Sequence, residues 1–339
     1  MERIQRILRQ HEKRLLKLEN VVGLGLGYKI IQGRTTNKPA IIVLVKEKIA
    51  DEKSLGRNVI PKILSDTPTD VIEVGEVKLL AARIEKARPA KPGMSIGHYR
   101  ITAGTFGALV RDQKTGDLLI LSNNHVLANA TDGSDGKSNI GDVILQPGAH
   151  DGGTSSDVIA YLERFVPISK NTEASRCAIA VKLEKTINNF LRIVKPNYEI
   201  SFIKKTYSRN LIDAAVARPV KTEYVTSDIV GLGEITGIEE PRIGMPLQKS
   251  GRTTGITSSQ IKALNVVIKV MLGPGEEATF YDQILTGPMA QPGDSGSIVV
   301  NEEIKAVGLL FAGSDQATLI NPIINVMKLL QVEVPGGPL

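Results

Sequence analysis

Short apolar segments separated by turn-forming residues recur from about residue 105 to the C-terminus, and this rhythm constrains the fold more than any other feature. Gly accounts for 32 of the 339 residues, and Gly supplies the tight turns that join short strands. Repeated short strands of this kind are typical of a sandwich or a barrel. The segments concerned are 105–111, 118–122, 212–218, 260–271, 280–286, 297–301 and 304–312.

Two segments in this part of the chain have helical spacing instead. The first predicts a helical insertion, through the side chains Ile187, Phe190, Leu191 and Val194. The second predicts a C-terminal helix that Asn321 caps, with Pro322 in its first turn. One face of that helix carries Ile323, Ile324, Met327 and Leu330.

The length of 339 residues is too great for one small core and predicts two domains. We expect an amphipathic helix over 1–20, a small α/β or β-rich accessory domain over 21–85, a linker over 86–97 and a larger domain over 98–339. Sequence typical of strands covers 21–31, 40–46 and 70–80. Glycines alternate with apolar residues in the first strand, but the spacing does not fit a nucleotide-binding loop. The stretch 86–97 is rich in Pro, Gly and Lys, which is typical of a linker.

The N-terminal helix carries side chains at the 4-3-4-3 spacing of a heptad seam, namely Ile4, Leu8, His11, Leu15 and Leu18. Either this face packs on the helix's own domain, or it makes a homo-oligomer through the N-terminal region. Both interpretations stay open at this point.

Composition indicates the cellular compartment of the protein and the classes of partner it has. Cys177 is the single cysteine, so no intramolecular disulfide can form, and its apolar neighbours predict burial. Residues 1–20 lack the apolar core of a signal peptide, and no run approaches the roughly 18 apolar residues of a membrane span. We therefore expect a cytoplasmic protein without a membrane partner. The net charge is +6, half of it in residues 1–20, and nucleic-acid binding is not expected.

Ser295 lies in Gly293-Asp294-Ser295-Gly296, and a nucleophilic serine needs a base and an orienting acid. No histidine follows Ser295, which excludes the Ser-acid-His order of an α/β-hydrolase. The order Asp-His-Ser, through Asp112 or Asp117, would need an α/β fold that the strands do not favour.

The order His-Asp-Ser remains. His125 follows the expected strand 118–122, and Asp213 lies among apolar residues where a buried carboxylate needs a partner. The separations are 213 − 125 = 88 and 295 − 213 = 82 residues. Asp157 is the alternative acid.

These three segments resemble those of the trypsin-like (chymotrypsin-fold) serine proteases, over residues 96–331. The stretch 249–255, Lys-Ser-Gly-Arg-Thr-Thr-Gly, is similar to a strand-turn segment of bacterial members. The layout, with a domain before the protease, is similar to bacterial proteins related to the plant narrow-leaf protease-like family. The resemblance implies a mainly β fold with a double six-stranded β-barrel.

It also implies a serine endopeptidase that acts on a protein or peptide through an acyl-enzyme, without a metal or cofactor. Ser295 would be the nucleophile, His125 the base and Asp213 the orienting acid. The backbone N–H groups of Gly293 and Ser295 would form the oxyanion hole.

The resemblance places the substrate pocket at Met289, near its base, and at Leu310, Phe311, Ala312 and Gly313, beside the substrate. None of these is acidic, so an apolar or small side chain is the expected preference. No activation site is found before residue 104, so Asp294 needs an internal partner or a different activation. Two alternatives stay open: a protease-fold binding or assembly module with a gated or inactive triad, and a self-processing protease that cuts within 86–97.

Overall fold

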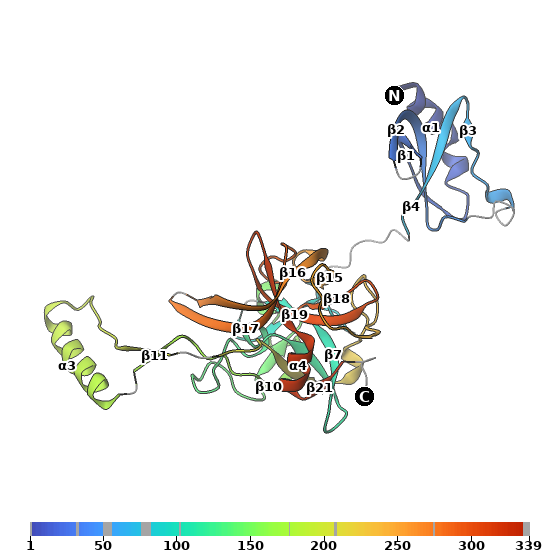
Figure 1. Ribbon diagram of the computed structural model, residues 1–339. Helices are drawn as coiled ribbons and strands as arrows, with labels where there is room; N and C mark the ends of the chain where they lie inside the picture. The colour runs from blue at the N-terminus through green and yellow to red at the C-terminus, as the bar shows by residue number, and fades with distance from the viewer. Residues whose placement is uncertain are drawn as a thin grey trace. The chain divides into compact units, whose positions relative to one another are not determined.

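The computed structural model describes residues 2–31, 34–49, 56–75, 83–101, 103–175, 177–206, 209–273 and 275–334. The chain divides into two compact units, Met1–Ala81 and Ala82–Leu339 (Figure 1). Helices of the described part are all too short or too polar to cross a membrane.

The first unit is a four-stranded sheet covered by the helix α1 (Glu2–Leu15). Its strands are β1 (Val21–Ile31), β2 (Arg34–Val45), β3 (Ile63–Leu64) and β4 (Thr67–Glu73), in the order β1-β2-β4-β3, with a 3-10 turn η1 (Gly56–Asn58) before β3. Ile7 and Leu15 of α1 are buried in one cluster with Ile41 and Val43 of β2. The apolar face of α1 thus packs on its own sheet, which favours the first of the two interpretations.

The second unit begins with a curled sheet. Its strands are β5 (Ser95–His98), β6 (Gly104–Thr105), β7 (Ala108–Asp112), β8 (Leu118–Ser122), β9 (Val143–Leu145), β10 (Val158–Phe165), β13 (Ala215–Pro219) and β21 (Val332–Glu333). The order is β21-β7-β8-β13-β10-β9-β5-β6. Only two residues join β6 to β7, although these strands lie near opposite ends of the sheet. The sheet must therefore curl back on itself.

The second sheet closes into a barrel. It contains β14 (Gly237–Ile238), β15 (Pro246–Gly251), β16 (Gly255–Gly273), β17 (Glu276–Thr286), β18 (Ile298–Val300), β19 (Lys305–Gly313) and β20 (Thr318–Pro322). The order is β14-β19-β18-β15-β16-β17-β20, and β19 also pairs with β20. That extra pairing closes six strands into a ring, to which β14 adds a short parallel edge.

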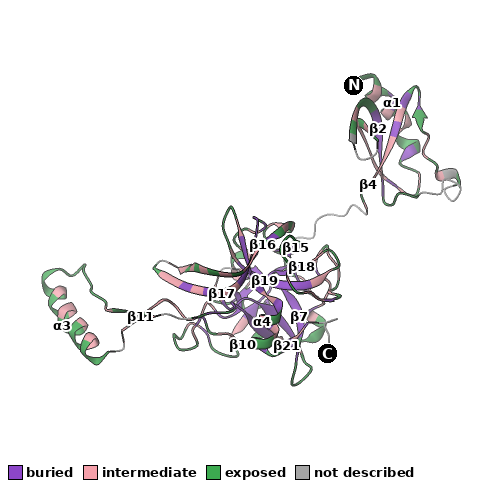
Figure 2. Cartoon of the chain, in the orientation of Figure 1, coloured by how far each residue is buried: buried purple, intermediate pink, exposed green. Residues whose placement is uncertain are grey.

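The two sheets share a core, and Figure 2 shows buried stretches, in purple, on the central strands of this unit. Leu121 of β8 and Leu309 of β19 belong to one buried cluster, together with Val326 of α4 (Ile323–Leu330). The predicted C-terminal helix is therefore present, but Asn321 does not cap it. The residue before the helix is Pro322, and the side chain of Asn321 is buried elsewhere.

The predicted linker at 86–97 is wrong. Ala90, Met94 and Ile96 are buried in the core of the second unit, and β5 begins within this stretch. Pro and Gly here serve turns inside a packed domain, so their composition misled the prediction.

The predicted helical insertion is present as α3 (Ala178–Val194), between the short paired strands β11 (Thr172–Ala174) and β12 (Ile203–Lys205). Cys177 directly precedes α3 and is exposed, so its predicted burial is wrong. Hydrogen bonds from the first backbone N–H groups of α3 lower the pKa of its thiol. The remaining short elements are α2 (Asn124–Leu127), η2 (Ala149–Asp151) and η3 (Thr222–Tyr224).

Candidate active site

Neighbouring strands of the first sheet bring His125 and Asp213 together. β8 runs directly into α2, which carries His125, and Asp213 lies two residues before β13. Because β8 and β13 pair, with Ser122 opposite Ala215, the adjoining residues also lie side by side. His125 Nδ1 lies 2.5 Å from Asp213 Oδ2, and the backbone N–H of His125 donates to Asp213 Oδ1 at 3.1 Å. The carboxylate thus holds both the ring and the main chain of His125.

Two asparagines fix the backbone of Asp213, whose side chain is 2% exposed. Asn123 Nδ2 donates to the backbone carbonyl of Asp213 at 2.7 Å. The backbone N–H of Asp213 donates to Asn321 Oδ1 at 3.0 Å. Asn321 therefore supports the acid, which is a role that the sequence did not reveal. Its only sequence signal was a polar residue within an apolar strand.

Asp213 controls the protonation of His125. Burial alone would lower the pKa of the imidazole, but the charge and hydrogen bond of Asp213 outweigh it and raise the pKa above its usual range. If Nδ1 carries the proton donated to Asp213, Nε2 is left as the acceptor. The side chain of His125 is 31% exposed and lines the cavity described below.

The turn around Ser295 depends on two glycines with positive φ, Gly293 at 99° and Gly296 at 93°. A Cβ on Gly296 would lie 2.4 Å from the carbonyl oxygen of Thr105, so only glycine fits there. Among the described residues, no hydrogen bond consumes the N–H groups of Gly293 and Ser295. These two donors remain available next to the serine hydroxyl.

Asp294 points away from the cavity into a fully buried site and meets Lys249 of β15. Lys249 Nζ lies 3.2 Å from Asp294 Oδ2, and both side chains have no exposed surface. Backbone N–H groups of Gln291, Thr253 and Thr254 also donate to the Asp294 carboxylate, at 2.9–3.1 Å. Burial opposes the charged form, but the Thr254 hydroxyl, these N–H groups and Lys249 together lower the pKa of Asp294.

Lys249 is thus the internal partner that the sequence left open. Its only sequence signal was a lysine in a strand-like segment. The Asp294 carboxylate also accepts from the N–H of Gln291, so this ion pair fixes the main chain just before Ser295.

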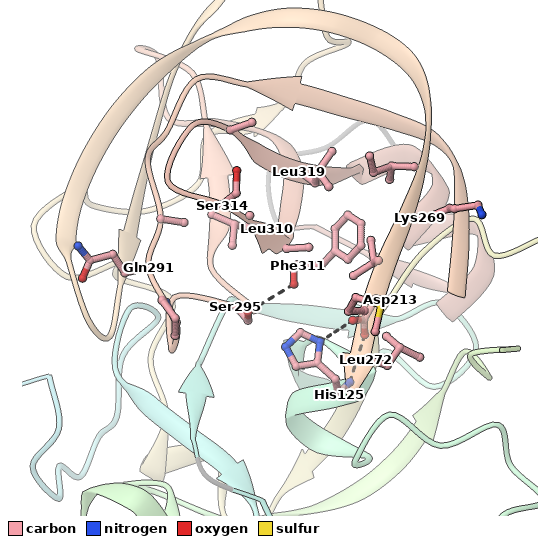
Figure 3. Close-up of a pocket in the computed structure, with 18 of the residues that line it drawn as sticks. His125, Asp213, Lys269, Leu272, Gln291, Ser295, Leu310, Phe311, Ser314 and Leu319 are labelled. Atoms are coloured by element: carbon pink, nitrogen blue, oxygen red, sulfur yellow. Dashed lines mark hydrogen bonds and ion pairs between the residues drawn. The ribbon is translucent and has the colours of Figure 1, made fainter. Parts of the chain in front are cut away.

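His125, Asp213 and Ser295 line one cavity of about 690 Å³ (Figure 3). Ser295 Oγ donates to the carbonyl of Phe311 at 3.4 Å, a long contact. Within the described chain there is no hydrogen bond between His125 Nε2 and Ser295 Oγ. The imidazole edge opposite Asp213 faces the side of the cavity where Ser295 lies (Figure 3).

The walls of the cavity are mostly apolar. Besides the three residues, they include residues 290–292, residues 310–315 in and just after β19 and residues 268–272 of β16. Of the predicted pocket residues, Leu310, Phe311, Ala312 and Gly313 line the cavity. Met289 does not, because it is buried in the barrel core, 3% exposed.

The long hairpin of β16 and β17 was not anticipated as a wall. Ile268, Val270 and Leu272 turn toward a cluster built around Phe280 and Phe311, whereas Lys269 and Met271 between them are exposed. In the sequence only Lys269 interrupts the apolar run 266–272, so no strict alternation of apolar and polar residues was there to identify this wall.

The alternative acids lie in other interactions. Asp157 pairs with Lys86 at 2.7 Å, Asp112 with Arg164 at 2.6 Å and Asp117 with Arg218 at 2.7 Å. The described residues contain no cluster of His, Cys, Asp or Glu suited to a metal ion. Asp213 is the acid that the fold brings to His125.

Two curled sheets, with His125 and Asp213 on the first and Ser295 on the second, give the chain a chymotrypsin-type fold, which is mainly β. Residues 5–74 match the family model of the NARROW LEAF 1 N-terminal domain.

Among curated proteins, the chain is 35% identical over 81 residues to Streptogrisin-A of Streptomyces griseus. This match covers 24% of the chain and only 22% of that protein. Among solved structures, Nocardiopsis protease aligns at 16% identity with a TM-score of 0.45, covering 72% of this chain and 99% of its own. Thermobifida fusca protease A aligns at 15% with a TM-score of 0.45, covering 72% and 98%.

Proposed function

We propose that the protein is a serine endopeptidase that hydrolyses peptide bonds through an acyl-enzyme. The double contact between Asp213 and His125, in the same cavity as Ser295, carries this proposal. Ser295 Oγ attacks the peptide carbonyl carbon and gives its proton to His125 Nε2. The C–N bond then breaks as His125 returns that proton to the leaving amine. Water repeats the sequence on the ester and releases the acid.

Stabilisation of the oxyanion falls to the N–H groups of Gly293 and Ser295. Each such donor is worth about 3 kcal/mol of transition-state stabilisation when it is fixed in advance. The buried pair of Lys249 and Asp294 supports this role, because it holds the turn in place before substrate arrives. We therefore expect activity without a preceding cleavage.

The substrate would be an extended protein or peptide segment. The pairing of β18 with β19 ends at Ile298 and Leu309, and Phe311 to Gly313 continue along the cavity. Such a strand end can pair with an added peptide strand. The apolar walls favour an apolar side chain before the scissile bond, and no cofactor is needed.

A fluorophosphonate probe tests the proposal, because it reacts with an activated serine. Wild-type protein should label and then fail to cleave casein, and Ser295→Ala should not label. Ser314→Ala is the matched control, since Ser314 lines the same cavity but has no role in the mechanism. Equal labelling of wild type and Ser295→Ala, or labelling lost in both variants, would refute the assignment.

One observation favours a second function, a protease-fold binding module with a gated site. The hydroxyl of Ser295 contacts Phe311 rather than His125. A wild-type protein that neither labels nor cleaves, yet binds a partner as well as Ser295→Ala does, would support this second function.

Self-processing within 86–97 is disfavoured. A protease cleft takes an accessible, extended segment, whereas Ala90 and Ile96 are fully buried. An unchanged intact mass after long incubation is the expected result.

We also propose that the protein works in a reducing compartment such as the cytoplasm. The single cysteine, Cys177, is exposed and would otherwise be open to oxidation. Fractionation that recovers the protein outside the cytoplasm would contradict this.

A further inference from the structure

The helix α3 differs from the other long helices of the chain because none of its 17 residues is buried (Figure 2). A helix in water is stabilised mainly by packing one apolar face against something else. α3 nevertheless exposes several large apolar side chains. Ile193 is 84% exposed, Ile179 78% and Phe190 65%.

The exposed side chains form one stripe. Ile179, Leu183, Thr186, Phe190 and Ile193 follow one another at intervals of 4, 3, 4 and 3 residues. This is the heptad spacing that keeps one seam facing a partner helix over several turns. Val194 is 54% exposed and widens the same seam at its C-terminal end.

The opposite side of α3 is already occupied by the chain itself. Asn188 makes two hydrogen bonds of 2.8 Å to the backbone N–H and carbonyl of Ile200. Glu184 accepts a hydrogen bond from the N–H of Phe202 at 2.9 Å. The returning segment therefore lies on the side away from the seam, and the orientation of the helix is fixed with its apolar stripe outward.

The size and symmetry of the seam identify a partner. Its apolar side chains expose on the order of 600 Å², near the upper end for patches on monomers and close to the roughly 800 Å² that each partner contributes to a stable interface. The seam is nearly the same when read in either direction from Thr186. Two copies can therefore pair antiparallel, with Ile179 opposite Ile193 and Leu183 opposite Phe190.

Charge is compatible with this arrangement. Lys182, beside the seam, would lie near the neutral Asn189 of the other copy rather than near a second lysine. We propose that α3 is a self-association surface, at which two copies of this chain pair through the seam about a two-fold axis near Thr186. This contact is independent of the proposed catalytic activity.

Sedimentation velocity over a concentration series tests the pairing with the full chain. We expect wild-type protein to form a dimer of the 36.6 kDa chain. Phe190→Glu with Ile193→Glu should weaken association at least about 100-fold, because it places four carboxylates in an apolar seam. Lys185→Glu is the matched control: it changes the net charge by the same −2, lies on the other side of α3 and should leave the dimer intact.

Cross-linking locates the contact. In a Cys177→Ser background, Thr186→Cys should form a disulfide-linked dimer under mild oxidation, whereas Lys185→Cys should not. Wild type that stays monomeric throughout the series overturns the proposal, and so does an assembly that the seam substitutions leave unchanged. A monomer that instead floats with anionic phosphatidylserine vesicles, and loses this through the same substitutions, would show a membrane surface as the partner and also overturn it.

Discussion

The turn around Ser295 and the helix α3 differ in where their side chains find interaction partners. At the turn, Asp294 and Lys249 are fully buried, and each finds its hydrogen-bond partners within the barrel. On α3 no residue is buried, and its largest apolar side chains face outward. The first region is complete within one chain, whereas the second is complete only with a partner.

This difference has a physical basis. A buried charge without a partner costs several kcal/mol, so a buried carboxylate requires its counter-ion in the same fold. An exposed apolar side chain costs less, and association can recover that cost later. The turn should therefore be sensitive to single substitutions, and α3 should tolerate them as long as only folding is measured.

The largest effect is expected at Asp213. Asp213→Asn keeps the size of the side chain but lets the neutral imidazole adopt the wrong tautomer, so kcat should fall by about 10⁴-fold. Hydrolysis of a chromogenic peptide measures it, with Asp117→Asn as a surface control. A loss below tenfold would mean that Asp213 does not orient the base.

Removing Lys249 comes next. Lys249→Met leaves the buried charge of Asp294 unpaired, and the free energy of unfolding should fall by about 3–5 kcal/mol. Urea denaturation measures it. Lys305→Met removes a more exposed pair with Glu303 and should lower the free energy of unfolding much less. Adding Asp294→Asn to Lys249→Met should restore part of the loss, and a purely additive double variant would argue against the coupling.

The pH profile tests the electrostatics of His125. The base must be neutral, so kcat/KM should fall as the pH drops through its raised pKa, above the usual histidine range. In the chain lacking the Asp213 charge, the residual activity should have its acid limb at lower pH. Coincident limbs would contradict the role of that charge.

The contribution of His125 to the free energy of unfolding should change with pH in the direction opposite to that of its contribution to activity. Because the pKa of His125 is higher in the folded chain, its contribution to stability is fully present below the unfolded value of about 6.5. That contribution is lost as the pH rises through the folded pKa. Urea midpoints of wild type and His125→Gln, compared across this window, should converge at high pH, and a constant difference would contradict the linkage.

The smallest effect is expected on α3. At a protein concentration too low for two copies to pair, Phe190→Glu should change the free energy of unfolding of the second unit by no more than about 0.5 kcal/mol, because its side chain is 65% exposed. Leu121→Ala, in the shared core, is the contrasting variant and should cost about 2–5 kcal/mol. A comparable loss for Phe190→Glu would show that α3 packs within its own chain, and the comparison would fail.

The spacing of apolar residues predicted several strands and a helix, because such elements depend mainly on residues close together in the sequence. The strands β1 and β8 have the bounds expected from their apolar residues, and a helical insertion was expected where α3 lies. The residues His125, Asp213 and Ser295 were found because their order along the chain excluded competing folds. Their catalytic roles stay predictions until the serine is tested.

Other features were predicted wrongly because they depend on residues that are distant in the sequence. Residues 86–97 read as a linker, but turns within a core use the same Pro and Gly residues. Asn321 read as a helix cap, yet it is used by Asp213, 108 residues earlier. Cys177 has apolar neighbours, but these belong to a helix whose apolar stripe faces outward.

By itself, the sequence determined a β-rich chain with a serine, a histidine and an aspartate in one order, because strand periodicity and short motifs are local properties. Only the tertiary structure decided that Lys249 neutralises Asp294, that β16 walls the cavity and that α3 keeps an open seam. Each of these depends on which distant segments share a buried site, and burial sets whether a charge needs a partner or an apolar face needs a second chain.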